Sequence, residues 1–254
     1  MALLLDGATD VINHGDIASI DLATANTIMF WLKPTSLTSN DSLVSKGSFA
    51  ASVSPVVIFT GAATDSLRVT WAGGGSFGNV ASWFTNGVWT HTAMVYDGGG
   101  AADADRLKVY KDGVAQTITF TGSVPTAYTD GGTDPFRVGY NGFSGFHNGA
   151  FAHVRVWSAA LTLGEVLLEW QSPRPIRGNQ LLLAASYEPG GVDGLDYCGN
   201  DYHGSLTGTT QVAGPPILDD QYLGRQRLGA VFNTNRRHRN QFRRTGPLQP
   251  RYLA

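Results

Sequence analysis

The chain has little cysteine and no long apolar run, and each absence excludes a class of protein. Its 254 residues include one cysteine, Cys198, so no disulfide can form within the chain and the fold depends on its apolar core. Nowhere do about 18 apolar residues follow one another, so we expect no transmembrane helix and no membrane partner. Residues 3–5 are apolar but meet Asp6 at once and follow no basic leader, so we expect no signal peptide.

Charge is scarce and unevenly distributed. Residues 1–220 carry 10 Lys and Arg against 20 Asp and Glu, whereas residues 221–254 carry eight arginines and no acid. The acidic part and the basic part are therefore expected to have different partners. Glycine, with 32 residues and no repeat period, indicates the many tight turns of an antiparallel fold.

Short β-prone runs separated by turn residues fill the first 157 residues. In residues 89–96, odd-numbered and even-numbered side chains face opposite sides of a strand, and Asp112-Gly113 is a two-residue turn between strands. This pattern predicts an all-β protein, a sandwich of two antiparallel sheets. The expected strands are residues 27–33, 43–45, 56–60, 67–71, 89–96, 107–110, 114–120, 136–139 and 151–157.

One short helix is expected to close the sandwich at residues 161–170, where apolar residues have helical spacing and Thr162 with Glu165 forms a capping box. Pro173 and Pro175 end it. We therefore divide the chain into a sandwich at residues 1–172, an appended segment at 173–218 that packs on the sandwich and contains a strand at 181–186, and an Arg-rich extended arm at 219–254.

Four motifs carry a resemblance to a known family. They are an opening strand and turn at residues 5–12, a tryptophan strand at 27–34, a Ser-Lys-Gly turn at 45–47 and a closing motif at 146–157. In order and spacing they resemble the laminin-G-like jelly-roll domains of the concanavalin A-like lectin and glucanase superfamily, over roughly residues 2–170. Residues 196–208 resemble a segment near the start of many such domains, with Cys198 and Asp201 in place of the usual Ser and Gly.

Catalysis is not expected from these residues. A glycoside hydrolase needs two carboxylates that face each other across a groove. The chain has three glutamates, of which Glu165 and Glu169 lie on the closing helix and Glu188 precedes a Pro-Gly turn, and the glucanases' Glu-x-Asp-x-x-Glu motif is absent. We expect a binding or structural protein without a cofactor.

The alternative to a protein without a cofactor is one that binds calcium, because related lectin-like domains bind this ion through oxygen ligands. Asp97, Asp103 and Asp105 are close enough in sequence to form such a site. The competing interpretation is a solvated hairpin loop, in which Asp and Gly serve turn geometry alone. In the closing motif the family's usual Asp-Glu pair is replaced by Ala152-His153, which removes two acids.

Glycan or protein binding requires a rim of aromatic and polar groups. Such residues are enriched in the glycine-rich loop at residues 140–146, and Trp83 is a further candidate for contact with a ligand. The alternative is that these aromatics anchor the loop. Trp31, Trp89 and Trp157 are expected in the core, and the six histidines at packing or surface positions. The expected ligand-binding residues are Tyr140, Asn141, Phe143, Phe146 and Trp83.

The basic arm is interleaved with aromatics and can bind an acidic protein surface or, less favoured, nucleic acid. With the sandwich, it resembles accessory structural proteins of tailed bacteriophages, made in the host cytoplasm and assembled into the virion as a capsid decoration or tail component. The arm would then contact other virion proteins or copies of itself. The alternative is a free, extracellular carbohydrate-binding module that binds surface glycans. The expected assembly contacts are Arg225, Arg227, Arg236, Arg237, Arg239, Arg243 and Arg244.

Overall fold

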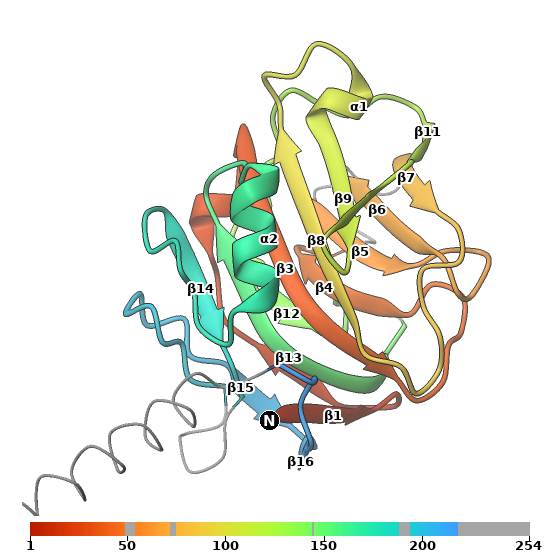
Figure 1. Ribbon diagram of the computed structural model, residues 1–254, viewed down its shortest axis with the longest axis vertical. Helices are drawn as coiled ribbons and strands as arrows, with labels where there is room; N and C mark the ends of the chain where they lie inside the picture. The colour runs from red at the N-terminus through yellow and green to blue at the C-terminus, as the bar shows by residue number, and fades with distance from the viewer. Residues whose placement is uncertain (49–53, 72–74, 144, 188–193, 218–254) are drawn as a thin grey trace, which may run out of the picture. The chain divides into compact units, whose positions relative to one another are not determined.

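A computed structural model of the chain describes residues 1–48, 54–71, 75–143, 145–187 and 194–217. Residues 1–217 form one compact unit. In the described part, the strands form two antiparallel sheets stacked as a sandwich, which confirms the predicted all-β class (Figure 1).

The first sheet has long, strongly curved central strands, β3 (Ala25–Pro34) and β13 (Asn148–Trp157) (Figure 1). A short strand, β14 (Leu181–Ala185), pairs with β13 beyond the point where its pairing with β1 (Ala2–Asp6) ends. The order across the sheet is β10 (Val114–Gln116), β9 (Leu107–Lys111), β8 (Thr90–Asp97), β3 (Ala25–Pro34), β13 (Asn148–Trp157), β1 (Ala2–Asp6) and β16 (Thr210–Val212), with β14 (Leu181–Ala185) paired to β13.

The second sheet covers one face of the first and is built from shorter strands. Its order is β11 (Thr119–Thr121), β7 (Ser76–Val80), β6 (Leu67–Trp71), β5 (Val56–Thr60), β4 (Ser42–Lys46), β12 (Phe136–Val138), β2 (Val11–Asn13) and β15 (Ser205–Thr207). The helical elements of the described chain are a 3-10 turn, η1 (Ala18–Ile20), and the helices α1 (Asp103–Arg106) and α2 (Leu163–Gln171).

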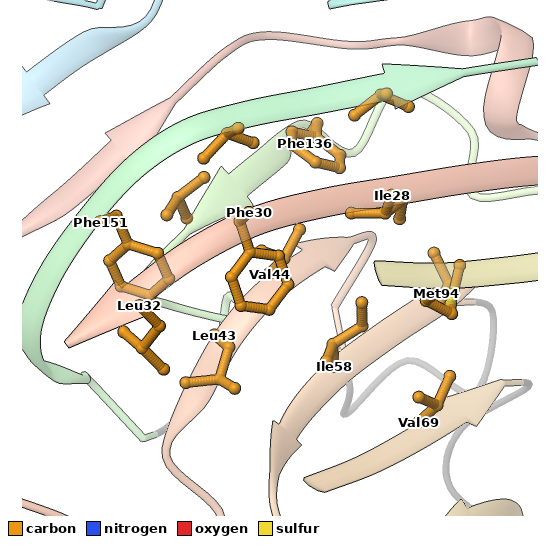
Figure 2. Close-up of a cluster of buried hydrophobic side chains, with 14 of the residues drawn as sticks. Ile28, Phe30, Leu32, Leu43, Val44, Ile58, Val69, Met94, Phe136 and Phe151 are labelled. Carbon is orange, nitrogen blue, oxygen red and sulfur yellow. The ribbon is translucent and has the colours of Figure 1, made fainter. Parts of the chain in front are cut away.

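The core lies between the sheets, and strand alternation selects its members. Figure 2 shows Ile28, Phe30 and Leu32, every second residue of β3, pointing into this space toward side chains of β4 and β5. In β8, Met94 and Tyr96 join the same core, as the alternation predicted. Burial of each large apolar side chain contributes about 1.5–3 kcal/mol, so this layer is the main source of stability.

The opposite face of the first sheet is also covered. The α2 helix lies across it, and Val166 packs with Met29, Val95 and Trp157 of the sheet (Figure 1). The helix begins at the predicted capping box, in which Thr162 Oγ1 accepts from the Glu165 N–H at 3.3 Å. Trp31 and Trp157, predicted for the core, are buried, but in clusters on this outer face and not between the sheets; Trp89 is partly buried there.

The segment after the helix is part of the sandwich. Strand β14 confirms the strand predicted at residues 181–186 and pairs with β13, while β15 pairs with β2 and β16 with β1. Residues 173–217 therefore extend both sheets, which is a closer association than the appended segment that the sequence suggested. The sequence had no β-prone run long enough to predict the last two strands.

Two details differ from the expected strands. The run at residues 114–120 is split, because β10 pairs within the first sheet and β11 within the second, with Thr117 and Ile118 crossing between them. Strand β7 was not predicted, since Gly78 lies at its centre. A Cβ at Gly78 would come within 2.8 Å of Ile118 Cγ2, so only glycine lets the crossing chain pack this closely on β7.

Candidate functional site

A cavity of about 480 Å³ opens on the outer face of the first sheet, beside β13 and β14. The loop at residues 173–178 forms one wall, and Tyr197 with Cys198 forms another. Its polar lining comprises His153, Arg155, Arg174, Ser186, Tyr197 and Cys198. Its apolar lining comprises Pro173, Pro175, Leu181, Ala184 and Ala185. We call this space the β13–β14 cavity; its volume is in the range of small-molecule sites, about 300–1,000 Å³.

A β-bulge in β13 places His153 in this cavity. Ala152 pairs with Trp31 of β3, but the next pair joins Arg155 to Met29, so β13 has one residue more than its partner there. On the other edge of β13, pairing with β1 ends at Phe151 and pairing with β14 starts at Val154. His153 occupies this break with a φ of 49°, in the left-handed region that is uncommon for residues other than glycine.

The His153 side chain is 8% exposed and forms no hydrogen bond with the described residues; its Nδ1 is buried without a partner. Burial, reinforced by the positive charge of Arg155, lowers the pKa of His153 to about 3. The imidazole is therefore neutral at physiological pH, with one N–H donor and one acceptor nitrogen. A neutral imidazole without a protein partner is suited to hydrogen-bond a hydroxyl group.

The wall at residues 173–178 is fixed by a buried ion pair. Arg155 Nη1 donates to Glu169 Oε2 at 2.8 Å, and Nη2 donates to the Ser172 carbonyl at 2.7 Å. The second carboxylate oxygen of Glu169 accepts the N–H groups of Ile176 at 2.9 Å and Arg177 at 2.7 Å. The pair therefore connects β13 to the end of α2 and to the loop, which gives the cavity a rigid wall.

A second part of the lining presents an aromatic ring and a thiol. The Tyr197 N–H donates to the Ala184 carbonyl at 2.9 Å, which fixes the backbone, while the side chain stays 50% exposed. The Cys198 thiol lies 3.2 Å from both the Leu182 carbonyl oxygen and Asp196 Oδ2. Burial first, and the hydrogen bond to Asp196 second, raise the pKa of Cys198 to about 11, so the sulfur stays protonated and is a poor nucleophile.

The glycine-rich loop predicted to bind ligand lies elsewhere, after β12. Tyr140 and Phe146 stack on each other with ring centroids 4.2 Å apart and 6° between planes, and both are half-buried. Asn141 is buried, and its Oδ1 accepts the Phe143 N–H at 3.0 Å, which is a turn function. Phe143, at 62% exposed, is the member of this set whose ring is available to a ligand.

Trp83 was expected at a binding rim, and this prediction is wrong. The side chain is 0% exposed and packs in the core between the sheets. Its Nε1 donates to Thr92 Oγ1 at 2.9 Å. The residues around Trp83 have the sequence pattern of a loop, but its indole ring is part of the apolar core.

The expected calcium ligands do not assemble. Among the described residues, no group of three or more His, Cys, Asp or Glu side chains could hold a metal ion. Each of the three aspartates instead accepts a backbone N–H: Asp97 from Gly99, Asp103 from Val124 and Asp105 from Ala102. The structure thus supports the alternative interpretation, in which this loop uses its acids for turn and cap geometry.

Several expectations fall outside the described residues. They are Glu188 and the arm residues Arg225, Arg227, Arg236, Arg237, Arg239, Arg243 and Arg244. In the part of the chain that is described, no helix has the length and apolar character to cross a membrane.

The two-sheet sandwich places the protein among the jelly-roll β-sandwiches of the lectin-like class. A family model, Laminin_G_3, described as the concanavalin A-like lectin/glucanases superfamily, matches residues 6–167. The chain belongs to this superfamily, as the sequence motifs predicted. Comparison with curated proteins finds no match.

Solved structures share the fold at low sequence identity. A Bacteroides ovatus protein assigned as carbohydrate-binding superposes with a TM-score of 0.64 at 17% identity, covering 86% of this chain and 62% of that one. A heptameric SAP-like pentraxin from Limulus polyphemus gives 0.51 at 15% identity, covering 69% and 83%. The extracellular region of zebrafish Gpr126 gives 0.53 at 12%, covering 85% and 26%. At these identities the similarity establishes the fold alone.

The residues of the cavity were not identified from the sequence. His153, Arg174 and Tyr197 come from three separate segments, and nothing in their spacing connects them. One sequence feature did point to the site: at Ala152-His153 the chain departs from the acidic pair of its family. That departure supplies the neutral, unpartnered side chain on which the site depends.

Proposed function

We propose that this chain is a non-catalytic binding domain that holds a saccharide in the β13–β14 cavity. The observation that carries the proposal is His153, a strained, buried and neutral imidazole that lines the cavity without a hydrogen-bond partner among the described residues. Buried polar groups without partners are rare, and at a cavity wall a ligand hydroxyl can supply the missing bond. The superfamily, which includes lectins, and the Bacteroides ovatus protein are consistent with this ligand class.

The rest of the lining suits a sugar as well. Tyr197 offers an exposed ring against which the apolar face of a pyranose can pack, and Pro173 and Pro175 add rigid apolar surface to the lining. Binding is favoured over hydrolysis because no carboxylate is found among the described lining residues. The two glutamates of α2 are occupied by arginines, Glu169 by Arg155 and Glu165 by Arg177.

Replacing Tyr197 by Ala is expected to weaken saccharide binding at least tenfold, because the stacking surface is lost, while thermal stability changes by a few degrees at most. The measurement is glycan-array screening followed by calorimetric titration of the best ligand. Phe143→Ala is the matched control, since it also removes one exposed aromatic ring, from the loop after β12. Loss of binding in Phe143→Ala but not in Tyr197→Ala would transfer the site to that loop.

A virion role remains a separate proposal, supported by the charge of the arm. Residues 221–254 carry eight arginines and no acid, while residues 1–220 have ten more acids than bases. A basic arm of this kind suits an acidic surface on a neighbouring virion protein or on another copy of the chain. A free extracellular binding module would not explain the charge of the arm.

Deletion of residues 219–254 is expected to leave a folded sandwich that no longer incorporates into particles, because the described fold closes by Ile217. Light scattering and mass spectrometry of purified particles measure incorporation, and circular dichroism measures folding. Incorporation of the truncated chain at the full-length level would disprove the assembly role. That result would leave saccharide binding unaffected.

A further inference from the structure

The charge balance around the β13–β14 cavity points to the class of saccharide that it binds. Two arginines line the cavity, Arg155 and Arg174, and no Asp or Glu does so among the described residues. The charge of Arg155 is neutralised by Glu169, with Nη1 and Oε2 2.8 Å apart and both side chains buried. Arg174 is exposed, and its side chain forms no ion pair or hydrogen bond with the described residues.

Arg177, three residues along the same loop, provides an internal comparison. Its Nη1 lies 2.6 Å from Glu165 Oε1, and it does not line the cavity. Both glutamates of α2 are therefore already ion-paired, Glu169 with Arg155 and Glu165 with Arg177. Arg174 lies on the same loop as Arg177 and differs from it in facing the cavity with its charge unpaired.

Asp196 directly precedes Tyr197 and Cys198 of the cavity lining, and its carboxylate is hydrogen-bonded within the fold. Its Oδ1 accepts the N–H groups of Ala184 at 3.0 Å and Cys198 at 3.1 Å, and its Oδ2 lies 3.2 Å from the Cys198 sulfur. It is buried and absent from the cavity lining. Arg174 forms no ion pair with any described acid, so its guanidinium is free to pair with a negatively charged ligand.

We propose that the β13–β14 cavity binds saccharides that carry a carboxylate, with Arg174 pairing with that carboxylate. This inference rests on the proposed saccharide-binding function. A guanidinium matches a carboxylate with two parallel N–H···O bonds, which an ammonium cannot do. In this arrangement His153 hydrogen-bonds a ring hydroxyl and Tyr197 packs on the sugar face. Uronic acids and sialic acids share the required chemistry.

The first test is a glycan array with matched acidic and neutral members: uronic acid oligosaccharides with their methyl esters, and sialic acid-terminated glycans with their unsialylated cores. The full-length chain is expected to bind acidic members about tenfold more tightly than their neutral partners, as one charge-assisted bidentate contact provides. Whichever acidic group binds identifies the source of the carboxylate. Equal binding of acid and neutral partner would overturn the acidic preference while the saccharide function stands. Absence of any binding would overturn both.

The second test assigns the preference to Arg174. By calorimetry on the best acidic ligand and its neutral partner, Arg174→Gln is expected to reduce the tenfold preference to about one. Arg174→Lys should retain part of it, because the charge remains but the bidentate geometry is lost. Arg177→Gln is the matched control and should leave the preference unchanged. A preference that survives in Arg174→Gln, or that disappears equally in Arg177→Gln, would refute the role of Arg174.

Discussion

An Arg155→Met variant is expected to lose about 3–5 kcal/mol of unfolding free energy, the cost of leaving one member of a buried ion pair without its partner. Glu169, 1% exposed in its side chain, would keep a carboxylate in the interior with its Oε2 unpaired. The carbonyl groups of Glu169 and Ser172 would also lose their donors, Nη1 and Nη2. Burial lowers the pKa of Arg155 to about 10, so the native side chain is still charged at neutral pH.

The matched control is Arg177→Met, which breaks the other arginine–glutamate pair of the same helix. Its side chains are partly exposed, at 22% for Arg177 and 33% for Glu165, and an ion pair of this kind contributes roughly 0–1 kcal/mol. Urea denaturation of both variants measures the difference. Equal losses in the two variants, or a loss below about 1 kcal/mol in Arg155→Met, would contradict the structural role assigned to the buried pair.

Acid is expected to unfold the protein with a midpoint near pH 5, because four histidines are buried in their neutral form. Burial is the first cause in each case: it lowers the pKa of His14 to about 4 and the pKa values of His91, His147 and His153 to about 3. In the unfolded chain a histidine takes up its proton near pH 6.5. Below that pH the unfolded state binds more protons, so stability is fully present above pH 6.5 and falls as the pH decreases toward 3.

The size of this effect is comparable to the stability of a whole domain. Each buried histidine costs about 1.4 kcal/mol per pH unit below 6.5, or about 2 kcal/mol at pH 5. Four of them together cost about 8 kcal/mol, against a typical unfolding free energy of about 5–15 kcal/mol. Urea titrations between pH 7.5 and 4.5 measure the slope.

His147 is the residue with which to test this origin. It is fully buried, both ring nitrogens lack hydrogen-bond partners among the described residues, and its ring packs edge-on against Phe151. His147→Met should therefore reduce the slope of stability against pH by about a quarter. The partly exposed His203, replaced by Gln, is the control. An unchanged slope in His147→Met would assign the acid sensitivity to the other buried histidines, His14 and His91 among them.

The fold could be predicted from the sequence because it depends on local patterns. Alternation in residues 89–96 placed Met94 and Ala93 on opposite faces of one strand, and the capping box at Thr162 located the helix. Strands β15 and β16 could not be predicted in this way, since each has three residues and is stable only because a partner strand is present.

The cavity was beyond sequence reasoning for a different reason. It requires a register shift in β13 that turns His153 outward, and no local pattern predicts where one strand gains a residue over its neighbour. Trp83 illustrates the converse: its neighbours indicate a loop, yet the ring is core, because burial depends on what packs against a residue from distant segments. The Ala152-His153 departure from the family motif was visible, but its meaning was not.

The most direct test of saccharide binding in the β13–β14 cavity is an NMR titration that follows the imidazole nitrogens of ¹⁵N-histidine-labelled protein. Binding in the cavity predicts saturable shifts of the His153 ring nitrogens, with those of His14 and His147 unchanged. Saccharide binding, established by calorimetry on the same sample, that leaves the His153 ring resonances unchanged would contradict the account and place the ligand outside the cavity.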